Sequence, residues 1–403
     1  MINSSEIRDF FPSIGRTDSN NNNIIYLDGP GGTQVPIQVI EAISEYYIRS
    51  NANTHGEFIT SKETDQVMDE LRLKMSEFLG SEGPNTISIG QNMTSLNYSL
   101  ARALAKKFKE GDEVVITELD HEANRGPWNV LKESGIKLIE VKLLQNGGLD
   151  YEDFRNKINE KTVMVCMGMS SNALGTLNDF KTVKSFLPSH CIFLLDAVHY
   201  APHFSINVNE LGCDFLLCSA YKFYGPHVGF LYSKPGTLDG LETDRLVVQN
   251  QSAPYIIETG TLNHAACAGV SSAIDFIANI GRGDSLRDRL INAYSQISSH
   301  EFNLAKQLYD SLIALEKVEV IGHDFSTTQR TPTVSFVHSD LSPREICSIL
   351  AKNNICAWDG HFYALKAIQQ LGLEKKGGVT RLGISIYNTK EEVDRVVSII
   401  SKL

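Results

Sequence analysis

The sequence predicts an α/β fold of the doubly wound class, in which helices cover both faces of a mostly parallel sheet, followed by a smaller α+β domain. Two observations predict the sheet. Short, apolar, β-rich runs recur along the first two thirds of the chain, and most are separated by segments of helical length with polar periodicity. Continuous apolar strands with helices between them are typical of a parallel sheet that is buried on both faces. A third observation predicts the second domain: after about residue 280 the alternation of short apolar runs and helical segments gives way to a long amphipathic stretch.

The alternation begins near residue 60. Residues 62–79 have helical periodicity, and a second helix is expected over 92–108, after the short run TISIG. The expected strands that follow are 113–117, 137–141, 162–169, 191–197, 214–220 and 228–233.

Beyond residue 280 the pattern starts with a long amphipathic stretch, 284–316, which is expected to hinge the two domains. Strands are expected within 331–338 and 380–386. Ser342 to Glu345 and Thr389 to Glu392 have the spacing of capping boxes, so each marks a helix start. We therefore predict a large domain over 24–280, a small domain over 281–403 and an N-terminal segment over 1–23, in which SNNNN forms a surface turn.

Composition excludes several classes of protein. The 403 residues carry 37 basic and 48 acidic side chains, a net charge of −11, whereas nucleic-acid binding favours a basic surface. We expect no membrane partner, because no apolar stretch is long enough to span a bilayer, and a cytoplasmic location, because the N-terminus lacks the layout of a signal peptide. The seven cysteines form no CxxC pair, which favours reduced thiols and no metal site.

The sequence does not match the common nucleotide-binding motifs. The best candidate for a GxGxxG fingerprint, GPGGTQ, has Gln34 at the third glycine, and there is no Walker A sequence.

Lys222 and Asp196 indicate a different chemistry. Asp196 ends the apolar run CIFLLD, and Lys222 follows the run DFLLCSA. A lysine that forms a Schiff base and a carboxylate that pairs with a pyridine nitrogen are the two standard protein contributions to a pyridoxal phosphate enzyme. Either residue alone is more often a charged group at a strand end. Together, at the same edge of one sheet, they predict pyridoxal 5'-phosphate as cofactor.

Several motifs then occur in a consistent order: YLDGPGG, DHEAN with PW, SSNALGT, DAVHYAPH, SAYKFYGPHVG, ETGT and YNTKEEVDR. With these motifs the chain resembles the class V aminotransferase family, and most of all its cysteine desulfurase-like branch, from about residue 24 to the end. The resemblance implies a fold-type-I homodimer whose active sites are shared between subunits.

The resemblance also implies roles for individual residues. Lys222 would hold the cofactor and act as the base at Cα, Asp196 would pair with the pyridinium, and His121 would stack on the ring. The remaining residues expected to bind cofactor or substrate are Asn92, Met93 and Thr94 at a helix start, Ser219 beside the phosphate, Thr261 from the other subunit, Asn172 beside the cofactor and the substrate carboxylate, and Arg381, which would bind that carboxylate bidentately.

The chain departs from the desulfurase pattern at several places. Tyr221 precedes Lys222 where the family usually has a histidine, and His199, expected to contact the cofactor, stands where desulfurases have a glutamine that does so. His55 keeps only the approximate position of a histidine-rich loop. In WDGHFYALK, Tyr363 takes the place of the nucleophilic cysteine, and Cys356 is expected to be a buried structural residue. Tyr363 would shape the pocket or bind substrate.

Three functions stay open on the sequence. The first is a desulfurase-like enzyme that acts on a small amino acid by Cα deprotonation and C–S cleavage or β-elimination. The second is a class V aminotransferase. The third, of a different class, is a non-catalytic scaffold that retains the fold, against which the presence of Lys222, Asp196 and Arg381 argues.

Overall fold

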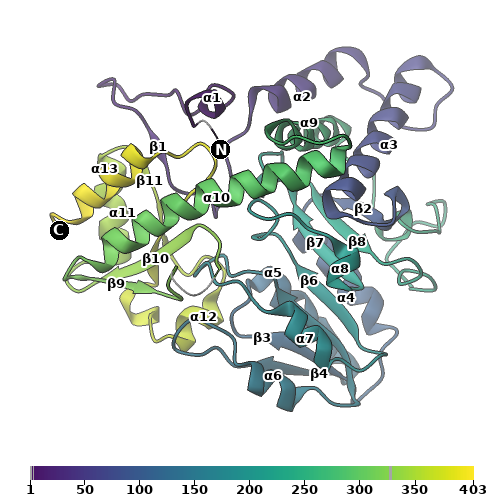
Figure 1. Cartoon of the computed structure of the whole chain (residues 1–403). Coiled ribbons are helices and arrows are strands. Elements are labelled where there is room, and N and C mark those ends of the chain that lie inside the picture. The colour runs from purple at the N-terminus through teal and green to yellow at the C-terminus, as the bar shows by residue number, and fades with distance from the viewer. Residues whose placement is uncertain (1, 3, 326–328) are drawn as a thin grey trace.

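The computed structural model describes residues 2, 4–325 and 329–403. Its centre is a seven-stranded sheet in the order β2-β8-β7-β6-β5-β3-β4 (Figure 1). The strands are β2 (Ile87–Gly90), β3 (Glu113–Thr117), β4 (Lys137–Val141), β5 (Thr162–Gly168), β6 (Ile192–Asp196), β7 (Phe215–Ser219) and β8 (Gly229–Ser233). All neighbouring pairs are parallel except those that involve β8, which runs antiparallel to β2 and β7. The expected α/β sheet is confirmed.

Successive side chains of each strand enter different apolar clusters, as the period of two requires. On β6, Phe193 and Leu195 pack into one cluster and Leu194 into the other. Helix α4 covers the Leu194 face, and α3, α6, α7 and α9 cover the opposite face. The helices of this part are α1 (Ser4–Arg8), α2 (Ile37–Arg49), α3 (Ile59–Leu79), α4 (Met93–Ala105), α5 (Glu122–Arg125), α6 (Tyr151–Lys157), α7 (Phe180–Phe186), α8 (Val208–Leu211) and α9 (His264–Ile280).

A second sheet, antiparallel and in the order β12-β13-β10-β9, forms the C-terminal part of the molecule. Its strands are β9 (Val318–Ile321), β10 (Thr333–His338), β12 (Trp358–Gly360) and β13 (Val379–Gly383), and a short parallel pair joins β1 (Ile25–Tyr26) to β11 (Ile355–Cys356). Its helices are α11 (Pro343–Lys352), α12 (Leu365–Gln370) and α13 (Lys390–Ile400). Both expected capping boxes are formed, at Ser342 and at Thr389.

Helix α10 (Leu286–Ile313) connects the two parts and runs across the middle of Figure 1. Leu290 and Ile297 belong to the core of the large sheet, whereas Leu304 and Leu312 belong to the core of the antiparallel sheet. One helix therefore packs into both cores, as the long amphipathic stretch predicts. The exact domain boundary at residue 280 stays a prediction.

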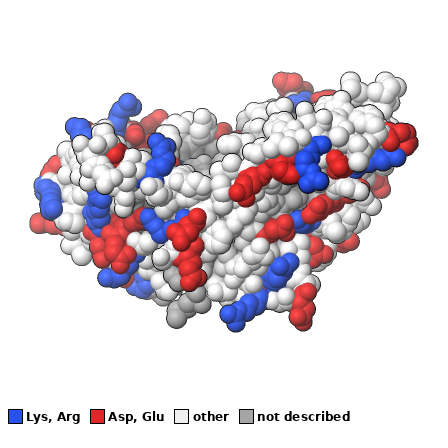
Figure 2. Space-filling model, turned by 90° about the horizontal axis from the view of Figure 1, so that it is seen from above, with Lys and Arg blue, Asp and Glu red and all other residues white. Residues whose placement is uncertain are grey.

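Acidic and basic side chains lie interspersed among uncharged ones on the face drawn in Figure 2. In the part of the chain that the structure describes, no helix has both the length and the apolarity to cross a membrane. All seven cysteines are free thiols.

Candidate active site

The carboxyl ends of the parallel strands bring the central candidates together. Asp196 is the last residue of β6, and Lys222 ends the 3-10 turn that follows β7. Both side chains are buried and line one small inner cavity of about 60 Å³. This is the crevice in which open α/β sheets bind their ligands.

An outer cavity of about 530 Å³ continues from the inner one. The residues that line both cavities are Thr94, His121, Ala123, Asn172, Tyr221 and Lys222. Arg381 of β13 and Tyr363 line the outer cavity, whereas Met93, Asp196 and His199 line the inner one. The C-terminal sheet thus supplies the presumed carboxylate-binding arginine, and the large sheet supplies the lysine and the aspartate.

Burial changes the acid–base properties of Lys222. Removal from water lowers the pKa of its amine from 10.5 to about 7, and the positive charge of Arg381 acts in the same direction, whereas Asp196 and Asp28 oppose it. The amine donates a hydrogen bond to the carbonyl of Pro30. A buried lysine with a depressed pKa has a substantial neutral fraction near pH 7, which is the form that attacks a carbonyl carbon.

Asp196 is held by its own turn. Its Oδ1 accepts a hydrogen bond of 2.9 Å from the backbone N–H of Val198. Burial nonetheless raises the pKa of this carboxyl from 3.8 to about 6. A cationic ring nitrogen placed beside it would favour the ionised form.

His121 caps the short helix α5, where its Nδ1 accepts a hydrogen bond of 2.9 Å from the N–H of Ala123. Because burial and the neighbouring cations Lys222 and Arg381 lower its pKa to about 4, the imidazole is neutral and carries its proton on Nε2. The ring of Tyr363 stacks on it at a centroid distance of 5.4 Å. A neutral, planar ring of this kind suits a stacking role.

The start of α4 has the features of an anion site. Asn92 is the N-cap and accepts from Ser95 N–H at 2.9 Å, and Met93 N–H donates to the hydroxyl of Ser219 at 3.1 Å. A Cβ on Gly229 would come within 2.2 Å of the Asn92 carbonyl carbon, so only glycine lets β8 approach this turn. The positive end of a 13-residue helix attracts a phosphate group.

Arg381 is buried within β13, where its Nη1 donates to the carbonyl oxygen of Asn172 at 2.9 Å. Its guanidinium lies 3.9 Å from the ring centroid of Phe362. Burial lowers its pKa to about 9, so it stays cationic at neutral pH. Among the described residues no carboxylate forms an ion pair with Arg381, and such a buried cation is suited to a substrate carboxylate.

Four buried polar atoms of residues that line the two cavities have no partner: Ser170 Oγ, Asn172 Oδ1, His199 Nδ1 and Arg381 Nε. Such atoms cost free energy unless a ligand satisfies them. Together with the lysine, the aspartate and the helix start, they fit pyridoxal phosphate and an amino-acid substrate. Metal ligation has no comparable support, since the described residues contain no cluster of three or more His, Cys, Asp or Glu side chains suited to a metal ion.

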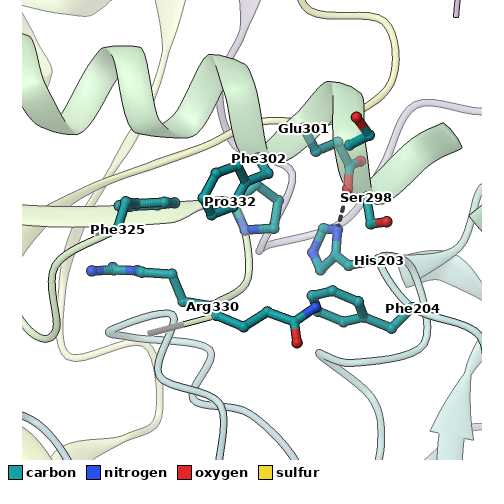
Figure 3. A pocket seen from close by; sticks show the side chains of 10 residues that line it. His203, Phe204, Ser298, Glu301, Phe302, Phe325, Arg330 and Pro332 are labelled. Carbon is teal, nitrogen blue, oxygen red and sulfur yellow. Dashed lines mark hydrogen bonds and ion pairs between the residues drawn. The ribbon is translucent and has the colours of Figure 1, made fainter. Parts of the chain in front are cut away.

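His199 lies in the inner cavity but is also tied to the C-terminal sheet. Its Nε2 is 3.0 Å from Thr333 Oγ1, and burial lowers its pKa well below the ordinary value. Its ring contacts that of His203 at a centroid distance of 5.5 Å. His203 in turn pairs with the buried Glu301 of α10 at 2.8 Å, at the edge of a separate cavity of about 390 Å³ (Figure 3).

Thr261 does not reach either cavity around Lys222. It is exposed and lines a different cavity, together with Ser95 of α4. Its expected contribution to the other subunit's phosphate site stays a prediction. His55 is also exposed, at a positive φ of 67°, and contacts Asp65.

Sequence reasoning missed several residues that the structure brings to the site. Asp120 precedes His121 and is buried behind it, with a pKa raised to about 7 by burial. The outer cavity also contains Tyr98 of α4, Trp358 of β12 and Phe362. Asp120 belongs to DHEAN and Phe362 to WDGHFYALK, so each could have been predicted from its neighbours in the motif. Tyr98 belongs to no motif that would have indicated a place in the site.

Comparison with known proteins agrees with this architecture. Residues 25–396 match the family model described as Aminotransferase class-V. The chain belongs to the class V aminotransferase family. This membership, with the homologues below, indicates a pyridoxal phosphate-dependent enzyme.

Similar chains include a probable cysteine desulfurase of Halalkalibacterium halodurans, which is 31% identical over 100% of this chain and 98% of its own length. An aminotransferase-like protein of Gibberella zeae, FGM3, is 29% identical over 97% of this chain and 96% of its own. Among solved structures, a cysteine desulfurase of Thermococcus onnurineus superposes with a TM-score of 0.89 at 27% identity, covering 100% of this chain and 98% of that one. The fold-type-I architecture is thereby confirmed.

Proposed function

We propose that the protein is a pyridoxal phosphate-dependent lyase, similar to cysteine desulfurases, that removes the Cα proton of an amino acid and expels the substituent on Cβ. One observation carries the proposal. Lys222, Asp196, His121 and Arg381 line one continuous space, while none of the seven cysteines does.

The residues would divide the work as follows. Arg381 binds the substrate carboxylate, and Asn172 holds the arginine from behind through its carbonyl. Lys222, which is buried and has a substantial neutral fraction near pH 7, takes the proton from Cα. Asp196 maintains a positive charge on the cofactor ring, and the bound cofactor would supply the electron sink that makes the Cα proton acidic.

No cysteine lines the two cavities around Lys222, so the site lacks a thiol that could form a persulfide. Cys356 is half-buried in β11 rather than fully buried as expected, and burial raises the pKa of its thiol to about 11. Tyr363 occupies the loop position where a nucleophilic cysteine would be needed, and it is 67% exposed. A phenol does not accept sulfur as a stable persulfide. Elimination, in which sulfur leaves with its own substituent, needs no such acceptor.

A class V aminotransferase is the alternative, because the same Cα deprotonation precedes both outcomes. We further propose a cytoplasmic homodimer, in which Thr261 serves the partner's phosphate site. Thr261 is exposed and lines neither cavity around Lys222 of its own subunit, which supports this arrangement.

The deciding experiment presents the cofactor-loaded protein with each proteinogenic amino acid and with cysteine analogues. Release of pyruvate and ammonium is expected for a lyase. Alanine with protein-bound sulfur would instead indicate a desulfurase. Formation of a 2-oxo acid with a stoichiometric pyridoxamine form would indicate a transaminase, and absence of any reaction would leave the scaffold hypothesis.

A further inference from the structure

The outer cavity is rimmed by aromatic side chains that remain partly uncovered. Tyr98 is 42% exposed, Trp358 is 54% exposed and Tyr363 is 67% exposed. They come from two separate segments of the chain: α4, and β12 with the loop that follows it. Exposed aromatic rings that converge on a concave site indicate a ligand with a flat, apolar group.

The loop that carries Tyr363 is held in an unfavourable backbone conformation. Phe362 and Tyr363 have φ values of 51° and 58°, a left-handed region that costs free energy for bulky residues. Two hydrogen bonds from other segments hold the loop there: Asn172 Nδ2 donates to the Phe362 carbonyl at 2.8 Å, and Glu122 N–H donates to the Tyr363 carbonyl at 2.7 Å. Strain that neighbouring site residues maintain is a sign of a functional conformation.

This conformation separates the two rings. Phe362 packs against the guanidinium of Arg381, so it belongs to the carboxylate-binding end of the cavity. Tyr363 instead stacks beside His121 and extends to the rim. When the substrate carboxylate lies at Arg381 and its Cα at Lys222, the substituent on Cβ lies in the rest of the outer cavity. That part of the cavity is lined by Tyr98, Trp358 and Tyr363.

From this arrangement we infer that the substrate is an S-substituted cysteine whose sulfur carries a flat, apolar group such as an aryl ring. The inference rests on the proposed lyase function and names its substrate class. Tyr98, Trp358 and Tyr363 are the residues that determine specificity. Unsubstituted cysteine leaves these three rings without a contact and has no thiol in the site to accept its sulfur.

The reaction balances without an oxidant or reductant. Lys222 takes the Cα proton, the Cβ–S bond breaks, and the electron pair leaves with sulfur as an aryl thiolate, which is protonated to the thiol. The three-carbon amine that remains tautomerises after release and reacts with one water to give pyruvate and ammonium. An aryl thiolate is also a better leaving group than an alkyl one, because its negative charge is delocalised into the ring.

Binding is tested with L-homophenylalanine, in which a CH₂ replaces the sulfur of S-phenyl-L-cysteine so that no bond at Cβ can be lost. Its small counterpart is L-2-aminobutyrate. Calorimetric titration of the cofactor-loaded protein should show tighter binding of the aryl compound by about tenfold or more, because its ring gains stacking contacts that L-2-aminobutyrate lacks. Turnover of S-phenyl-L-cysteine should yield thiophenol and pyruvate in equal amounts.

Two variants test the rim. Tyr363→Asn removes the ring while keeping a residue that tolerates a positive φ, and Tyr98→Ala removes a ring from a helix surface. Each should lower the aryl preference, which is the affinity for L-homophenylalanine relative to that for L-2-aminobutyrate, about threefold or more. Tyr47→Ala, which removes a 57% exposed ring of α2 outside both cavities, is the matched control and should leave the preference unchanged.

Several outcomes would overturn the inference. These are equal binding of the two compounds, tighter binding of L-arginine than of L-homophenylalanine, or a preference that both rim variants leave intact. Sedimentation of the variants separates a further possibility: if they dissociate to monomers, the rings serve a subunit contact and the inference is wrong. The proposed function is judged separately: it fails when the cofactor does not attach to Lys222, or when the products are those of a desulfurase or a transaminase.

Discussion

Replacement of Lys222 by methionine should stabilise the cofactor-free protein in a pH-dependent way. The lysine is buried, and its pKa is lowered from 10.5 to about 7. Since the unfolded chain binds this proton more tightly than the folded one, the group destabilises the fold at neutral pH, and the penalty decreases as pH rises from about 7 to 10.5. Methionine has a similar length and no charge.

The magnitude follows from the shift. At 1.36 kcal/mol per pKa unit, the penalty at pH 7 is about 4 kcal/mol and at pH 10 it is about 1 kcal/mol. The methionine also leaves the Pro30 carbonyl without its donor, which costs about 1 kcal/mol. We therefore expect Lys222→Met to gain about 3 kcal/mol at pH 7 and about zero at pH 10.

Urea denaturation of the cofactor-free proteins at the two pH values measures the difference. Lys132→Met, at an exposed position, is the control and should change little at either pH. An equal gain at pH 7 and pH 10 would show that the effect is simple hydrophobic burial. A loss of stability at pH 7 would refute the reasoning, because it would mean that the buried amine is not held at an energetic cost.

Three further predictions concern the site. Asp196→Asn should weaken cofactor retention during dialysis and greatly slow exchange of the substrate Cα proton with D₂O; unchanged exchange would show that this carboxylate is not the partner of the ring nitrogen. Treatment with L-cysteine should give no persulfide on Cys356 by mass spectrometry, and a persulfide that forms during turnover would restore the desulfurase mechanism. Mixing a Lys222 variant with a Thr261 variant should regenerate some intact sites if the subunits share them, whereas a mixture as inactive as its components would argue against sharing.

Site residues could be predicted best from the sequence where a charged side chain directly follows a predicted strand. Asp196 and Lys222 were predictable because each follows an apolar run, and parallel strands place their carboxyl ends at one edge. Arg381 was predictable because a charged residue is rare in an apolar strand. The helix starts at Ser342 and Thr389 were predictable because capping boxes depend only on local hydrogen bonds.

Contacts between segments that are far apart in the sequence could not be predicted in this way. The apolar run of β8 looks the same in either direction, so its antiparallel orientation depends on partners and not on its own pattern. The hydrogen bond between His203 and Glu301 joins residues 98 positions apart. Trp358 reaches the cavity because β12 pairs with β13, a contact that no local motif indicates.

The most direct test of the account is the identity of the residue that holds the cofactor. Protein loaded with pyridoxal phosphate is reduced with borohydride, digested and mapped by mass spectrometry. The account predicts a yellow protein before reduction and a single phosphopyridoxyl label on Lys222 after it. A protein that stays colourless with added cofactor, or a label on a different lysine, would contradict it.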